Sequence, residues 1–584
     1  MSNTGDLVSR VYSNFRGVDF RGEEINIVRS PDSVNMWKDY KETESISTRP
    51  GMELLNDLGD YFGTVYSISF YKDEMLVHIG QRLLKIVDDT VTLLSGTPLN
   101  GGEVVGFGLV DGFTSNSFVF EDKWYFLDGN HYVVYDGDTI KEVEGYVPTT
   151  SIGRKPVATV DDPVAGGTIF EDINLLQPRR INTFLADGTS KVFWLDATDV
   201  DTNPYPIVKV NGKEVERGAF ELDPGKGRIV FTKAPEKPLT DGQDNVSVEF
   251  SKTLTKHRRA IQRCKLVQPF DNRVFFTGND EYPNAVWHCS LNDPTYVSDL
   301  DYYREGMDEA KVTGIVAGNN ALWVFREPSD ANTNVFYHTP TIDDEYGKIY
   351  PSTHSSVTTG CIGKAINFND DIVFFSDRGM EGISGDVTTE QVVAHRSTLV
   401  DRKLTAEENY THMILAEWEG YLLVIIDSRV YLADSRGVFT NEDHIEYEWF
   451  YWELENRITC AKVHNGVLYL GAGGSIYTLT DPKANVESYW VTPKDKFKYP
   501  HMQKTTNKKS CTIEALGDFS VSAKTNRDDD FMLLDDFENV TDACSCRVKK
   551  KKFKDIQLKF HSHKRFALET ATLECFIGGY LKNL

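Results

Sequence analysis

A short pattern of strand, two-residue turn and strand recurs along the chain, and it constrains the fold more than any other feature. Its cleanest copy is VHNGVLYLGAGGSIYTL at 463–479, where Asn465 and Gly466 separate two apolar runs. Asn-Gly favours a tight hairpin because both turn positions need a positive φ. The flanking β-branched, aromatic and leucine residues suit a buried, pleated surface. This stretch is therefore predicted to be a β-meander.

The same pattern is repeated at regular intervals. Seven copies begin at residues 70, 120, 270, 316, 368, 416 and 463, so the successive intervals are 50, 150, 46, 52, 48 and 47 residues. The long interval equals one period plus a large insertion. A period of about 45–52 residues built from strands is typical of the four-stranded blade of a β-propeller. A large sandwich with similar hairpins by chance is the alternative, and the regular spacing favours the propeller.

Composition agrees with a chain built from strands. Aromatic residues make up 12% of the 584 positions, which supports a well-filled β core, and long helical patterns are nearly absent. We therefore predict an all-β protein: a β-propeller of about seven blades with an inserted small β-sandwich and a C-terminal β-domain.

Five segments follow from this pattern. Residues 1–60 form an N-terminal arm, which could complete the last blade or contact a neighbouring subunit. Alternating patterns and Asn-Gly or Asp-Gly turns predict the sandwich in the insertion. The remaining boundaries are 61–156 for the first blades, 157–253 for the inserted sandwich, 254–480 for the later blades and 481–584 for the C-terminal β-domain.

The net charge argues against a nucleic-acid-binding protein, and the lack of long apolar runs argues against a membrane-spanning one. The net charge is −25, whereas a protein that grips nucleic acid by its phosphates should be prominently basic. An acidic wall would instead let DNA slide past, although solubility is a more common reason for acidity. No run of eighteen apolar residues occurs, and the start lacks the features of a secretory signal, so neither a membrane span nor export is expected.

Two short motifs contain metal-binding residue types. The eight cysteines are spread out and are interpreted as reduced, buried thiols, and Cys544-Ser545-Cys546 alone is a weak metal signal. His561-Ser562-His563 is the closest histidine pair, and both rings would face one side of a strand, but no third ligand stands nearby. We therefore predict no metal site and no cofactor.

Catalytic signatures are missing as well. The chain has no nucleophile elbow, zinc-protease motif, phosphate-binding loop or dinucleotide fingerprint. Ser-Asp-Arg-Gly at 376–379 resembles part of a sialidase Asp-box but lacks the rest of it. Propeller glycosidases use paired carboxylates, but a chain with 88 acidic residues always offers some pair, so such a choice is uninformative. The prediction is that the protein is not an enzyme.

Several short segments resemble one family of phage proteins. These are Tyr-Leu-Leu-Val at 421–424 followed by Val-Tyr-Leu-Ala-Asp-Ser-Arg at 430–436, Tyr-Glu-Trp-Phe-Tyr-Trp at 447–452, Trp-Val-Thr-Pro at 490–493, and Phe-Lys-Asp-Ile-Gln-Leu at 553–558. Arg-Ser-Pro-Asp-Ser-Val-Asn-Met at 29–36 and Thr-Arg-Pro-Gly at 48–51 fit the same impression. Together they resemble the tail hub or nozzle propeller of short-tailed bacteriophages, also called tubular tail or DNA-stabilisation proteins.

This resemblance implies a structural virion protein made in the bacterial cytoplasm and located in the tail. Such a protein forms a homo-oligomeric ring, expected to be a hexamer, below the portal-adaptor proteins. The ring carries tail fibre or needle proteins and continues the channel through which genomic DNA passes without sequence-specific binding. Acidic residues of the C-terminal β-domain are the channel-lining candidates, although such loops are commonly just solvated: Asp528, Asp529, Asp530, Asp535 and Asp536.

Two other functions remain open at this point. One is a glycan-binding or glycan-cleaving receptor-binding propeller of a phage tail, which predicts a central pocket of acidic and aromatic residues. The other is a bacterial scaffold propeller that binds host partners as a stable monomer. Fold alone cannot choose among them.

Overall fold

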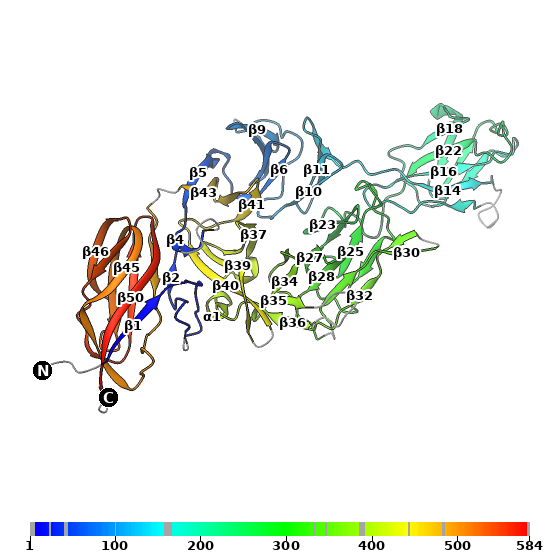
Figure 1. Cartoon of the computed structure of the whole chain (residues 1–584). Coiled ribbons are helices and arrows are strands. Elements are labelled where there is room, and N and C mark those ends of the chain that lie inside the picture. The colour runs from blue at the N-terminus through cyan, green and yellow to red at the C-terminus, as the bar shows by residue number, and fades with distance from the viewer. Residues whose placement is uncertain are drawn as a thin grey trace. The chain divides into compact units, whose positions relative to one another are not determined.

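The computed structural model describes residues 6–22, 25–39, 45–99, 101–156, 166–330, 333–344, 347–384, 392–441, 444–481 and 485–580. The chain divides into two compact units, one made of 1–114, 318–338 and 353–584 and the other of 115–317 and 339–352. Strands dominate both units, and α1 (Asp401–Leu404) is a single turn of helix. The predicted all-β propeller is confirmed: antiparallel meanders follow one another along the chain (Figure 1).

Four meanders of the first unit are complete. One is β6 (Val65–Tyr71), β7 (Glu74–Ile79), β8 (Arg82–Val87) and β9 (Thr90–Ser95), and the next is β33 (Ala365–Phe368), β34 (Asp371–Ser376), β35 (Gly379–Ser384) and β36 (Val392–His395). Then come β37 (Ile414–Trp418), β38 (Tyr421–Ile426), β39 (Arg429–Asn441) and β40 (His444–Glu453). The last is β41 (Cys460–His464), β42 (Val467–Ala472) and β43 (Ser475–Asp481), and its fourth strand is β5 (Gly51–Asp57) from the N-terminal segment.

The second unit holds two more complete meanders. These are β10 (Asn116–Phe120), β11 (Lys123–Leu127), β12 (Tyr132–Tyr135) and β13 (Ile140–Glu142), then β23 (Leu266–Phe270), β24 (Arg273–Thr277), β25 (Ala285–His288) and β26 (Tyr302–Arg304). It also contains the hairpin of β30 (Thr341–Asp343) and β31 (Gly347–Ile349). The repeat that begins at 316 contains residues assigned to both units. Its four-stranded sheet consists of β27 (Val312–Gly318), β28 (Ala321–Arg326), β29 (Val335–His338) and β32 (Ser352–His354).

The hairpin turns have the backbone conformation that the repeat predicts. At Asn465 and Gly466, φ is 49° and 78°, and at Asn369 and Asp370 it is 50° and 64°. The copies at 121–122, 271–272, 319–320 and 419–420 likewise have positive φ at both turn positions, whereas the first copy has it only at Lys72. These mirror-image turns match the twist of the strands that they join.

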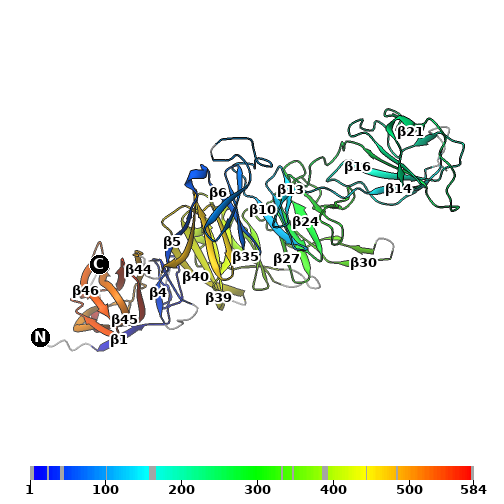
Figure 2. The same ribbon diagram turned by 90° about the horizontal axis from the view of Figure 1, so that it is seen from above.

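The insertion forms a two-sheet sandwich with its own core. One sheet contains β14 (Thr149–Arg154), β15 (Thr168–Ile169), β16 (Arg179–Phe184), β18 (Ile207–Val210), β19 (Lys213–Glu214) and β22 (Val246–Ser251), and the other contains β17 (Val192–Trp194), β20 (Phe220–Asp223) and β21 (Arg228–Phe231) (Figure 2). Its first strand begins at Thr149, before the predicted boundary at 157, because residues 149–154 form a strand that pairs with β16.

The C-terminal β-domain is built from β44 (Ser488–Val491), β45 (Met502–Thr525), β46 (Met532–Val540), β47 (Ala543–Cys546), β48 (Lys551–Phe553), β49 (Ile556–Ser562) and β50 (Phe566–Tyr580). Four N-terminal strands join its sheet: β1 (Leu7–Tyr12), β2 (Ser33–Val34), β3 (Met36–Trp37) and β4 (Ile46–Thr48). β1 pairs along β50, as Figure 1 shows, β2 pairs with β44, and β4 pairs with β50. Ile556, Leu558 and Phe560 are fully buried, as the alternation at 554–560 predicts.

Candidate basic pocket

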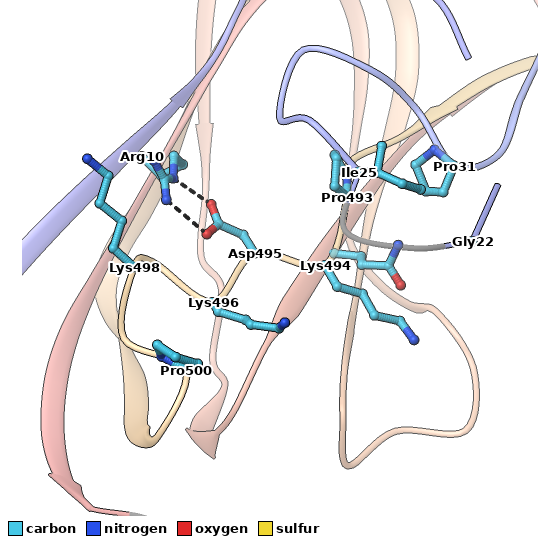
Figure 3. A pocket seen from close by; sticks show the side chains of 11 residues that line it. Arg10, Gly22, Ile25, Pro31, Pro493, Lys494, Asp495, Lys496, Lys498 and Pro500 are labelled. Carbon is cyan, nitrogen blue, oxygen red and sulfur yellow. Dashed lines mark hydrogen bonds and ion pairs between the residues drawn. The ribbon is translucent and has the colours of Figure 1, made fainter. Parts of the chain in front are cut away.

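A cavity of about 780 Å³ lies in the first unit, between the N-terminal segment and the start of the C-terminal β-domain. Its walls come from strand β1, from Gly22, Ile25 and Pro31, from the segment that precedes β45, and from strand β49. Its lining residues are Arg10, Gly22, Ile25, Pro31, Pro493, Lys494, Asp495, Lys496, Lys498, Pro500 and Gln557 (Figure 3). Four basic side chains and a single carboxylate therefore line it.

The carboxylate of Asp495 accepts hydrogen bonds from three residues. Arg10 donates to it through Nε at 2.7 Å and through an Nη atom at 3.3 Å, as the dashed lines of Figure 3 show. The hydroxyl of Tyr12 donates at 3.0 Å, and the backbone N–H of Phe497 donates at 2.6 Å. Burial, together with the charge of Asp495, holds the pKa of Tyr12 well above its usual value, so this phenol stays protonated and can donate.

Local sequence explains this arrangement. Arg10 and Tyr12 are two positions apart on β1, so they face the same side of that strand. In the segment 494–498, Asp495 and Phe497 are buried, whereas Lys494 and Lys498 are exposed and Lys496 is half-buried. The alternation places the acid inward and directs the lysines toward the pocket and solvent.

The chemistry of this pocket is that of an anion-binding surface. An ammonium acts as a compact point charge for phosphate or carboxylate groups. The Asp495 carboxylate is occupied by donors from three residues, which does not suit it to the role of a nucleophile or general base. Sequence reasoning missed this pocket, although the Lys-x-Lys-x-Lys run at 494–498 and the prolines that flank it were a usable signal.

A second cavity of the same unit, about 600 Å³, has mixed charge. Its Arg429 forms an ion pair with Glu407, which also accepts a hydrogen bond of 2.6 Å from the hydroxyl of Tyr431. The ammonium of Lys403 lies 3.4 Å from the centre of the Tyr451 ring. These groups are paired with one another, so the cavity has the character of a structural charge network.

A histidine between two carboxylates forms a titratable cluster in the later blades. His395 lies 3.1 Å from Glu381 through Nδ1 and 2.6 Å from Asp401 through Nε2. Burial lowers the pKa of His395, but the hydrogen bonds and charges of Asp401 and Glu381 outweigh it and raise the pKa to about 10. The charged imidazolium therefore donates to both acids and joins β36 to β35 and α1. The adjoining residues 376–379, which resemble part of an Asp-box, are the tight turn between β34 and β35.

The channel-lining candidates all lie in the hairpin of β45 and β46. Asp528 accepts hydrogen bonds from Thr525 and lies 2.8 Å from the ammonium of Lys550, and these contacts overcome the effect of burial and lower its pKa to about 2. Asp529 and Asp530 are exposed in the turn, and Asp535 and Asp536 are exposed on β46. A single subunit does not define a channel, so their role there stays a prediction.

The histidine pair has a neighbour that the sequence did not suggest. Glu487, His561 and His563 offer ligand atoms that all lie within 4.8 Å of one another. The expectation that this pair lacks a third ligand nearby is therefore wrong, because β44 pairs with β49 and brings in a residue 74 positions away. Of the eight cysteines, seven are buried and Cys544 is half-buried, as expected for thiols packed in strands.

Comparisons with known proteins give distant similarities. No protein-family model matches the chain, and no curated protein matches it. Among solved structures, it is similar to BamB from Moraxella catarrhalis, with 10% identity, a TM-score of 0.30, and coverage of 74% of this chain and 97% of that chain. The N-terminal domain of Nup159 gives 10% identity and a TM-score of 0.30, with 74% and 94% covered.

An enzyme also appears among these structures. The exo-β-1,3-galactanase of Phanerochaete chrysosporium has 9% identity and a TM-score of 0.19, with 53% of this chain and 94% of that chain covered. Similarities at this level carry no argument about function.

Within the described part of the chain, no helix has the length and apolarity needed to cross a membrane.

Proposed function

We propose that this chain is a structural subunit of a short-tailed phage tail, the hub or nozzle ring below the portal-adaptor proteins. In this role it extends the DNA channel, helps to retain packaged DNA and anchors fibre or needle proteins for genome ejection. It acts as a homo-oligomer, expected to be a hexamer, without a cofactor and without catalysis. It is made in the bacterial cytoplasm and resides in the virion.

One observation carries the proposal: backbone hydrogen bonding is continuous from the C-terminal β-domain into a propeller blade. Fifteen strands share one sheet, whose main path runs β2-β44-β49-β45-β50-β4-β3-β40-β39-β38-β37. The N-terminal strands β3 and β4 form the link between β40 of the blade and β50 of the domain. Such a sheet suits a part that must transmit load between neighbours, because pulling the domain from the blade must break the backbone pairing of β3 and β4.

The charged groups support the same role. Ion pairs within the chain engage Asp495, Glu407 and the acids around His395, and this suits a scaffold better than a catalytic centre. The basic pocket offers an anchoring point for an acidic segment of a tail partner. The net charge of −25 suits the wall of a conduit, because repulsion prevents DNA phosphates from adhering to it.

The first test is the mass and symmetry of the purified chain, by native mass spectrometry and negative-stain imaging. We expect a six-fold ring with a central hole, either alone or on addition of a portal-adaptor complex. A particle that stays monomeric at high concentration with the adaptor present would contradict the proposal. Binding or cleavage in a glycan panel would then favour the receptor-binding alternative.

A charge test addresses the channel. Changing the five candidate acids to asparagine alters the net charge from −25 to −20, and we expect the assembled ring to retain duplex DNA more strongly at low salt. The matched control neutralises five exposed acids of the inserted sandwich, Glu214, Glu216, Glu221, Glu236 and Asp241. Equal retention by the two variants would show that the candidate acids do not face the DNA.

A further inference from the structure

The two strands that carry Glu487 and the histidine pair are held in a defined register. β44 and β49 are antiparallel, with Ser488 opposite Ser562 and Tyr489 opposite His561. Glu487 immediately precedes β44, and His563 immediately follows β49. Glu487, His561 and His563 therefore lie together at one end of this strand pair, as the nearness of their ligand atoms shows.

All three side chains lie on the outward face. Ser488 and Ser562 are buried, so the alternating positions Glu487, His561 and His563 point the other way. The two imidazole rings have centroids 4.7 Å apart and are nearly perpendicular, at 88°. Their ring nitrogens can therefore converge on one point without blocking each other.

Distances within the cluster match those of a metal site. The ligand atoms all lie within 4.8 Å of one another, and Nε2 of His561 is 3.2 Å from Oε1 of Glu487. With metal–ligand bonds of about 2.0–2.1 Å in a tetrahedron, neighbouring donor atoms lie about 3.3 Å apart. One pair already has this separation, and small side-chain rotations bring in the third donor.

The backbone of the cluster is anchored on both strands. The carbonyl of Glu487 accepts a hydrogen bond of 2.8 Å from the amide of Asn35, and the carbonyl of His561 accepts one of 3.2 Å from Ser520. The nearby ammonium of Lys559 lies 3.9 Å from the centre of the Tyr489 ring. The ligand positions are thus set by the sheet, and only side-chain freedom is lost when an ion binds.

We propose that Glu487, His561 and His563 bind one divalent transition-metal ion of the zinc class. Two imidazoles and one carboxylate suit Zn²⁺ and its neighbours, whereas Mg²⁺ and Ca²⁺ prefer oxygen donors alone. Three protein ligands leave a coordination position for water or for a donor from a partner protein. The bound ion would clamp the start of β44 to the end of β49. This inference does not depend on the proposed tail function.

The test is calorimetric titration of the metal-free full chain with Zn²⁺. We expect one ion per chain, binding at least about tenfold weaker in Glu487→Gln, and no binding at this stoichiometry in the double variant His561→Ala/His563→Ala. His501→Ala, which removes an exposed histidine outside the cluster, is the matched control and should bind as the parent does.

Two further readouts make the result decisive. Zn²⁺ should raise the melting temperature of the parent and of the His501→Ala variant but not that of the double variant. Co²⁺ in place of Zn²⁺ should give a visible absorption spectrum that the double variant lacks. Binding of unchanged affinity in the double variant, or no binding of one ion to the correctly folded parent, would overturn the proposal.

Discussion

The inserted sandwich and the C-terminal β-domain are both small β modules, but they are built in opposite ways. Buried apolar residues of the inserted sandwich come from 184–250 alone, and both of its sheets use strands between Thr149 and Ser251. The core of the C-terminal β-domain instead includes Tyr12, Phe15, Trp37 and Ile46 from the other end of the chain. The core of the inserted sandwich comes from its own segment, although residues 173–175 pair with 297–299 outside it. The C-terminal β-domain is instead completed by distant sequence.

This difference teaches where the chain can be divided. A segment that closes its own sheets and core keeps that core when its neighbours are removed. A domain that borrows β1, β2 and β4 has an open sheet edge and an incomplete core without them. The first is a candidate for exchange as a module, whereas the second depends on strands from the other end of the chain.

The largest effect is expected when the two modules are expressed as separate fragments. We expect a fragment of residues 148–252 to fold as a cooperative monomer, because its core is complete. A fragment of residues 485–584 should stay unfolded or aggregate, because the edge of β50 and the contacts of Tyr12 and Trp37 are lost. Circular dichroism and thermal melts test both.

Rescue provides the control for this experiment. Co-expression of residues 6–48 with the C-terminal fragment should restore a folded complex, whereas the same peptide should not change the inserted fragment. A C-terminal fragment that melts cooperatively on its own would contradict the interdependence of the two chain ends.

A smaller effect is expected from single ion pairs. Asp495→Asn removes the charge from a buried carboxylate that Arg10 contacts at 2.7 Å, and we expect a loss of about 3 kcal/mol in local stability. The matched change in the inserted sandwich is Asp223→Asn, whose partner Arg228 lies at 2.8 Å in a more exposed pair, and we expect less than about 1 kcal/mol.

Hydrogen exchange of peptides from β50 and β21 reports the two local stabilities within one intact protein. Equal losses in the two regions would show that the Arg10–Asp495 contact is not an essential link between the chain ends.

The smallest expected effect is a dependence of local stability on pH, which we expect at β36 of the blades and not in the inserted sandwich. The pKa of His395 rises from 6.5 to about 10 on folding, so its contribution is complete below about pH 6.5 and is lost as the pH rises toward 10. Because 28% of the side chain is exposed, solvent screening keeps this loss below that of Asp495→Asn.

Hydrogen exchange at β36 measured between pH 6 and 10 tests this sign. The variant His395→Gln should remove the dependence, and residues 149–251, which contain no histidine, should not show it. A β36 segment that becomes more stable with rising pH would contradict the assignment of a charged His395.

Much of the fold was readable from local sequence. The period of the repeat, the two-residue turns and the alternation of Ile556, Leu558 and Phe560 depend on a residue and its near neighbours. The site was less accessible, because the basic pocket requires Arg10 of β1 to meet Asp495, which is 485 positions away. The lysines of 494–498 were visible in sequence, but their shared pocket was not.

Local sequence specifies the fold class, the meanders and the inserted module, because backbone turns and period-two patterning are local properties. Tertiary structure alone decided three further features. It paired β1 with β50, it joined the C-terminal β-domain to a blade through β3 and β4, and it brought Glu487 to the histidine pair. Each depends on contacts between strands far apart in the chain, and such pairings follow from which edges remain open after the local hairpins have formed.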